Sequence, residues 1–143
     1  MRRFICILSI LTQAMALSAK NYYVSPQGKD KNNGLSKSKA FASLAQAQAL
    51  VAPGDTVYIM PGTYKVKQKD LMAPTYQKVY AVAFLLDKSG TAQKRINYIG
   101  MTDAQGKRPV FDFSEVKPDA RITGFLLRGS YLHIKNIESI GIQ

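Results

Sequence analysis

Short apolar segments alternate with polar turns along most of the chain. Segments rich in Val, Ile, Leu and aromatic residues lie at 79–86, 96–99, 110–113, 122–127 and 131–137. Gly, Pro, Asp, Asn and Ser, which favour turns, fill the stretches between them. Two earlier segments, 22–24 and 55–60, have the same β-prone character. The pattern predicts a series of short strands, with no sustained helical period after residue 51.

One helix is predicted, immediately before a strand. Ser43 can cap its first turn, and Gln46 stands three residues later, where a capping box needs Glu or Gln. Leu44, Ala47 and Val51 are spaced by three and four, so they form one apolar side. A Pro-Gly pair then ends the helix. A helix this short is unstable in isolation, and we expect its apolar side to pack against the strands.

Three polar stretches are expected to turn or loop. Residues 25–38 are rich in Gly, Asn and Ser, residues 61–64 include a Pro-Gly pair, and residues 65–77 follow no clear pattern. Asp30 and its neighbouring asparagines allow two interpretations. Their oxygens suit calcium, but such side chains more often bond nearby backbone in turns, and we favour the turn.

Sandwiches, barrels and β-solenoids all contain regularly spaced short strands. No two-residue Asn-Gly or Asp-Gly turn joins two of the predicted strands directly, as it would in an antiparallel hairpin. A solenoid needs cover at its ends, because an open end exposes core side chains and unpaired strand edges. The predicted helix is well placed to provide that cover, so the pattern favours a β-solenoid with an N-terminal helical cap.

The first 19 residues predict a secretory signal peptide. A positive start is followed by an apolar run and then by small residues that a peptidase accepts, with cleavage after Ala16, Ser18 or Ala19. The apolar run is shorter than a membrane span, which needs about 20 residues, so no transmembrane segment is predicted. Cys6 is the only cysteine and lies in this leader, so disulfides are not expected in residues 20–143.

Basic residues outnumber acidic ones. The chain has 20 Lys and Arg against 9 Asp and Glu, a formal net charge of +11. Removal of the leader with Arg2 and Arg3 leaves a net charge of +9. An acidic partner such as an anionic polysaccharide suits this balance. The basic residues do not interleave with aromatic residues as in proteins that bind single strands, so no nucleic-acid partner is predicted.

Three blocks of sequence resemble the N-terminal section of secreted right-handed parallel β-helix proteins. They are Tyr-Tyr-Val-Ser-Pro-x-Gly-x-Asp-x-Asn-x-Gly-Leu-Ser at 22–36, Phe-x-Ser-Leu-x-x-Ala at 41–47, and Pro-Gly-Asp-Thr-Val-Tyr-Ile-x-x-Gly-Thr-Tyr at 53–64. Residues 88–92, 96–98 and 109–112 resemble the first coils of the same proteins. The resemblance is strongest to pectate lyases of polysaccharide lyase family nine, including members that act on rhamnogalacturonan. One departure is Ala40, where this group usually has proline.

The resemblance implies an all-β fold, a right-handed parallel β-helix whose N-terminal coils carry a short capping α-helix. It also implies β-elimination of an acidic, pectin-like polysaccharide by a secreted, periplasmic or cell-surface protein. In this family a lysine removes the proton beside the uronate carboxylate, and calcium held by aspartates makes that proton more acidic. Calcium is therefore the cofactor expected for a full-length member.

The acidic residues of this chain do not form such a calcium site in the sequence. The nearest pair, Asp112 and Glu115, suits a turn or the surface, so we assign no catalytic residue and no metal ligand. The family carries these residues on later coils, which would follow Gln143. Residues 20–143 are thus expected to be the cap and first coils of an incomplete domain whose C-terminal coils are missing, and we do not expect activity from them alone.

Three basic side chains are candidates for contact with an acidic substrate. His133 lies between Leu132 and Ile134 and points to the opposite side of a strand, and Lys135 shares its side. Arg128 lies just upstream. A lone histidine without an evident partner is more typical of a surface residue than of a catalytic base.

Two other functions stay open. A non-catalytic β-helix module would bind acidic glycans or a cell surface without cleaving them. A β-helix glycoside hydrolase would need a pair of carboxylates on either side of a cleft, and the sequence does not show one. The oligomeric state is not predicted.

Overall fold

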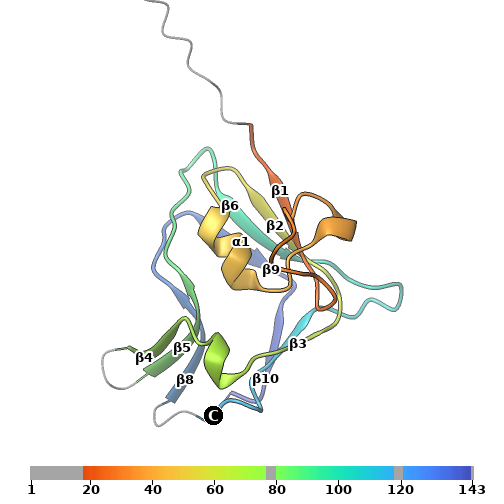
Figure 1. Ribbon diagram of the computed structural model, residues 1–143. Coiled ribbons are helices and arrows are strands. Elements are labelled where there is room, and N and C mark those ends of the chain that lie inside the picture. The colour runs from red at the N-terminus through yellow and green to blue at the C-terminus, as the bar shows by residue number, and fades with distance from the viewer. Residues whose placement is uncertain (1–17, 77–79, 118–120, 143) are drawn as a thin grey trace, which may run out of the picture.

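The computed structural model describes residues 18–76, 80–117 and 121–142. Three sheets surround a common core (Figure 1), with the strand orders β1-β2-β6-β9, β10-β7-β3 and β4-β5-β8. The strands are β1 (Asn21–Val24), β2 (Thr56–Ile59), β3 (Thr63–Lys65), β4 (Ala73–Tyr76), β5 (Tyr80–Leu86), β6 (Ile96–Gly100), β7 (Val110–Asp112), β8 (Arg121–Leu127), β9 (Leu132–Lys135) and β10 (Glu138–Ile140). The helix α1 (Leu44–Leu50) and two 3₁₀ turns, η1 (Lys37–Lys39) and η2 (Gln68–Asp70), complete the described elements.

The chain visits the three sheets in the same order in each turn. It passes through β2, β3 and β5, then through β6, β7 and β8, and then through β9 and β10. Corresponding strands of these successive turns pair in parallel. Among the described strands, β4 alone is antiparallel to its neighbour, β5. This arrangement is a parallel β-helix, so the predicted solenoid is confirmed.

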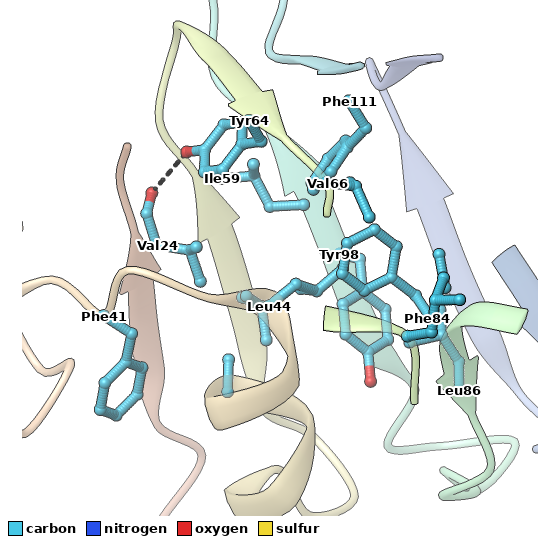
Figure 2. Packing of buried hydrophobic residues seen from close by; sticks show 14 of the residues in the cluster. Val24, Phe41, Leu44, Ile59, Tyr64, Val66, Phe84, Leu86, Tyr98 and Phe111 are labelled. Atoms are coloured by element: carbon cyan, nitrogen blue, oxygen red, sulfur yellow. Dashed lines mark hydrogen bonds between the residues drawn. The ribbon is translucent and has the colours of Figure 1, made fainter. Parts of the chain in front are cut away.

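Aromatic side chains fill the part of the core where the β10-β7-β3 sheet faces the β4-β5-β8 sheet. Figure 2 shows Tyr64 and Phe111 side by side with Phe84 below them, and the Tyr64 and Phe111 ring centroids are 4.8 Å apart. Phe84 also meets Phe111 edge to face at 5.1 Å and Phe125 at 5.0 Å. Burying a side chain of this size stabilises the fold by roughly 1.5–3 kcal/mol. The contact between Phe84 and Phe111 therefore helps to hold the β4-β5-β8 sheet against the β10-β7-β3 sheet.

Two buried tyrosines place their hydroxyls on polar partners inside the core. The Tyr64 hydroxyl lies 3.0 Å from the Val24 carbonyl and 2.8 Å from the Met60 carbonyl, which share its single proton, and the Val24 contact is drawn in Figure 2. Tyr98 donates to the side-chain oxygen of Gln48 on α1. Burial raises the pKa of both phenols above the ordinary tyrosine value. Both side chains therefore remain neutral donors well above neutral pH.

The helix α1 packs against the first turns of the solenoid, as predicted. Leu44, Ala47 and Gln48 are its buried residues, and Figure 2 shows Leu44 reaching from the helix toward Tyr98. Gln48 also donates from its amide to a carboxylate oxygen of Asp87 at 3.3 Å. The helix is thereby tied to strand β6 and to the chain just after β5. The burial of a glutamine on this side was not predicted from the apolar spacing.

The N-terminal cap of α1 differs in part from the predicted capping box. Ser43 Oγ accepts from the Gln46 amide at 3.2 Å, as expected. The Ser43 amide donates to Asp30 Oδ1 at 2.8 Å, and the Ala42 amide donates to the same oxygen at 2.9 Å. Asp30 thus takes the role assigned to Gln46, because a carboxylate from the preceding loop occupies the Ser43 amide. Asp30 therefore binds backbone amides, but at the start of α1 instead of within its own turn.

The loop between β1 and α1 covers the free edge of β1. Tyr23 donates to Gly34 and accepts from Phe41, while the Ser25 amide donates to the Phe41 carbonyl, all at 2.7–2.9 Å. Gly34 has φ +71°, and a Cβ there would lie 2.1 Å from the Phe41 ring. The loop therefore requires glycine at this position, and it satisfies backbone groups that would otherwise face solvent.

A buried carboxylate fixes the other side of the cap. Asp55 is only 4% exposed. Its two oxygens accept from the Lys20 amide at 2.7 Å and the Ala52 amide at 2.9 Å. The aspartate of the Pro-Gly-Asp-Thr block therefore joins the chain before β1 to the chain after α1.

Three local predictions were wrong. Residues 63–65 form strand β3 instead of continuing a turn, because Thr63–Lys65 pair in register with β7. The stretch 65–77 contains η2 and β4. The predicted strand 131–137 is shortened to β9, because Asn136 adopts φ +56° and turns the chain into the next sheet, where β10 follows beyond the predicted range.

We expect Ser43→Ala to lower the free energy of unfolding by about 1 kcal/mol, because it removes the side-chain acceptor at the start of α1. Urea unfolding followed by circular dichroism measures the change. Ser36→Ala is the matched control, since Ser36 precedes η1 without a side-chain cap bond. Its effect should stay within about 0.5 kcal/mol, and equal losses in both variants would contradict the role of the Ser43 cap.

Stability should decrease in alkaline solution because of Tyr64 and Tyr98. Burial raises the pKa of both phenols in the folded state, so the unfolded chain releases these protons at lower pH. Their contribution is therefore complete below about pH 10 and is lost as the pH rises further. Urea unfolding at several alkaline pH values tests this. The Tyr64→Phe variant should show a shallower decrease than the wild type, and parallel slopes would contradict the assignment.

Candidate functional site

The outward side of the four-stranded sheet carries a row of polar residues and is the candidate site. Successive residues of β1, β2 and β6 alternate between buried and partly exposed or exposed, and those of β9 alternate between partly buried and exposed. Because the strands are parallel and in register, outward residues align in rows across the sheet. We call this side the outer face.

A polar row crosses all four strands of the outer face. Its members in register are Asn21, Thr56, Asn97 and His133. The Asn97 amide nitrogen donates to Thr56 Oγ1 at 3.3 Å, and the Asn97 amide oxygen lies 3.3 Å from His133 Nδ1. Asn97 therefore orients the imidazole of His133 and leaves its Nε2 directed away from this contact.

A second row lies two residues further along each strand. It consists of Tyr23, Tyr58, Ile99 and Lys135. The rings of Tyr23 and Tyr58 stack with centroids 5.4 Å apart and planes 24° from parallel. Both rings are partly exposed, whereas Lys135 is exposed. We call this the tyrosine row; it places aromatic rings near the cap and a positive charge at β9.

The outer face has no carboxylate among these eight positions. The salt bridge that the described residues form lies elsewhere, between Lys65 and Glu115 at 3.0 Å. Lys135 therefore has no acidic partner within the described part of the chain. The face combines hydroxyl, amide, imidazole and ammonium groups, which suits a ligand rich in hydroxyls and carboxylates.

The structure places two of the three predicted contact residues together. His133 and Lys135 are both exposed on the outer face, on the side opposite Leu132 and Ile134. Arg128 follows β8, in a different sheet, where its amide donates to the Leu86 carbonyl. The role of all three in binding stays a prediction.

Sequence reasoning did not single out the rest of this face. Alternation within a strand could have placed Tyr23, Tyr58 and Asn97 outward. Their alignment with His133 and Lys135 depends on pairing between strands far apart in the chain, which no local pattern reveals.

The acidic residues near strand β7 serve a turn and a surface ion pair. Asp112 Oδ1 accepts from the Ser114 amide at 3.0 Å, and hydrogen bonding to Ser114 lowers the pKa of this carboxyl. Glu115 pairs with Lys65, whose pKa it raises. These contacts agree with the turn and surface interpretation of Asp112 and Glu115. In the ranges that the structure describes, no three His, Cys, Asp or Glu side chains gather in a group that could hold a metal ion.

A hollow of about 470 Å³ lies between the loop before α1 and strand β3. Phe84 and Phe111 contribute to its apolar lining, and Asp30, Lys65 and Asp70 are its charged residues. Each charged group already has a partner, since Asp70 Oδ2 accepts from the Lys67 amide at 2.9 Å. The outer face is the stronger candidate because Lys135 and the tyrosine hydroxyls are uncommitted there.

The predicted signal peptide lies mainly outside the described residues. Cys6 and Ala16 belong to residues 1–17, which lie outside the described residues. Ser18 and Ala19 are described as exposed residues without regular structure before β1. Within residues 18–76, 80–117 and 121–142, no helix has the length and apolar character of a membrane span.

Comparison with known proteins gives one matching family and several related lyases. Residues 22–143 match the family model described as "Pel9A-like, right handed beta helix region". Pectate lyase L of Dickeya dadantii is 35% identical over 121 residues, covering 82% of this chain and 25% of the relative. The corresponding protein of Dickeya chrysanthemi matches to the same extent. The chain thus spans about a quarter of the length of these curated relatives.

Two solved structures are similar to this chain in both fold and sequence. A rhamnogalacturonan lyase is 44% identical with a TM-score of 0.80, covering 87% of this chain and 29% of its own. Pectate lyase Pel9A is 31% identical with a TM-score of 0.59, covering 85% of this chain and 28% of its own. The similarity therefore includes both the order of the strands and their arrangement in space.

Proposed function

Because this chain belongs to the Pel9A-like right-handed β-helix family, we propose that it forms the cap and first coils of a polysaccharide lyase that cleaves an acidic pectic chain by β-elimination. The observation that carries the proposal is the family match across 22–143, nearly all of the residues that the structure describes. Relatives named as pectate lyase and rhamnogalacturonan lyase support a substrate of the pectic class.

The chemistry of β-elimination defines what such an enzyme must supply. A base removes the proton on the carbon beside the uronate carboxylate, and the glycosidic oxygen on the neighbouring carbon leaves as a double bond forms. A positive group near the carboxylate makes the proton more acidic, and calcium supplies that charge when it is bound. The substrate-facing groups must point outward from the coils, because the interior is filled with apolar side chains.

The described residues do not fit a calcium site. Asp30, Asp55 and Asp112 accept hydrogen bonds from backbone amides, and Glu115 pairs with Lys65. We therefore assign no step through calcium to this chain. We propose that the calcium ligands and the base belong to the part of the enzyme that this chain does not span, consistent with its coverage of about a quarter of the curated relatives.

The basic side chains at β8 and β9 are the groups that we propose to contact substrate. Lys135 and His133 share the outer face, and Arg128 extends from the turn before β9. Charge complementarity with uronate carboxylates supports this role. The signal peptide predicted for the first 19 residues supports export, so we propose a secreted, periplasmic or cell-surface location.

The complete gene product should form unsaturated sugar ends from polygalacturonate or rhamnogalacturonan, and chelation of calcium should abolish the reaction. The 143-residue chain alone should form none. Ultraviolet absorbance of the unsaturated product measures both. New reducing ends without this absorbance would indicate hydrolysis, and binding without any cleavage by the complete product would indicate a non-catalytic module. Either result would contradict the proposed lyase.

A further inference from the structure

The outer face has the size and repeat needed for an extended ligand. Neighbouring strands of a sheet are about 4.8 Å apart, so each row crosses four strands over about 14 Å. Each strand contributes one side chain to each row. A polymer that crosses the strands would therefore meet a new polar group at regular intervals, whereas one that follows a single strand would meet two at most.

Several donors on the outer face are not used within the fold. In the part of the chain that the structure describes, Lys135 has no ion pair, and the stacked rings of Tyr23 and Tyr58 are partly exposed, with no hydrogen bond from either hydroxyl to the fold. Stacking of the two tyrosine rings limits the conformations of both side chains, so little entropy is lost when their hydroxyls bind a ligand. Asn97 fixes the His133 ring in the same way.

We infer that the outer face of the four-stranded sheet is an accessory binding surface for an acidic polysaccharide, which crosses the strands from Lys135 and His133 toward Tyr58 and Tyr23. Charge complementarity selects this occupant, because the eight outward positions offer the Lys135 ammonium and several hydrogen-bond donors and contain no carboxylate. The inference rests on the proposed function for the class of ligand. To that function it adds the tyrosine row as a contact surface and the path of the polysaccharide across the strands. Binding at this face requires no bond cleavage there.

Affinity electrophoresis of the full 143-residue chain in gels containing polygalacturonate tests the inference. His133→Gln combined with Lys135→Gln should weaken retardation about tenfold, because the ammonium charge of Lys135 and the imidazole of His133 are both lost. Tyr23→Phe combined with Tyr58→Phe should weaken it about fivefold, because two hydroxyls are lost while the stacked rings remain. Lys117→Gln is the matched control, since it removes one exposed charge from a different side of the solenoid. Its effect should stay below about twofold.

Each result has a defined meaning. Selective weakening by the two outer-face variants, with no retardation of the wild type by neutral dextran, supports the surface. An unretarded wild type, unchanged double variants, or equal weakening by Lys117→Gln overturns it. These outcomes leave the proposed lyase activity intact, because formation of unsaturated product by the complete gene product is measured separately. Circular dichroism of every variant confirms that the fold is retained.

Discussion

A loop that covers the first strand of a solenoid takes the edge amides and carbonyls of that strand out of water, and each would cost about 1–3 kcal/mol if left without a partner. Strand β1 pairs with β2 on one edge, and the loop before α1 satisfies its other edge through Gly34 and Phe41. The later strands of this sheet, β2, β6 and β9, follow on the opposite edge of β1. The cap is therefore the condition for the stack, and its glycine and aromatic residues are explained by backbone pairing rather than by ligand binding.

Aspartates that a functional search would examine first are used to build this cap. Asp30 binds two amides at the start of α1, and Asp55 joins the segments on either side of the first strand and helix. A carboxylate can hold two backbone donors at once, which a neutral side chain of similar size does less well. The roles of Asp30 and Asp55 thus reflect the geometry of an end, where more backbone groups lack partners than in the middle of a stack.

The sequence contained enough information for the class of fold and for the capping helix, but not for the corners or the outer face. Apolar composition located most strands, because each buries side chains in one core. It missed β3 and the corner at Asn136, whose conformations are set by neighbouring turns of the solenoid. His133 and Lys135 could be placed on one side by alternation alone. Their alignment with Tyr23 and Tyr58 could not, because register between turns is a property of the assembled stack.

The corner between the first and second sheets differs in length from one turn to the next. It comprises residues 60–62 after β2, 101–109 after β6 and 136–137 after β9, yet β3, β7 and β10 remain in register. Gly106 at the longest corner has open space around it. The cost of closing a flexible loop rises only slowly with its length. Insertions at this corner therefore cost the fold little stability, and they can add new surface while the strands keep their register.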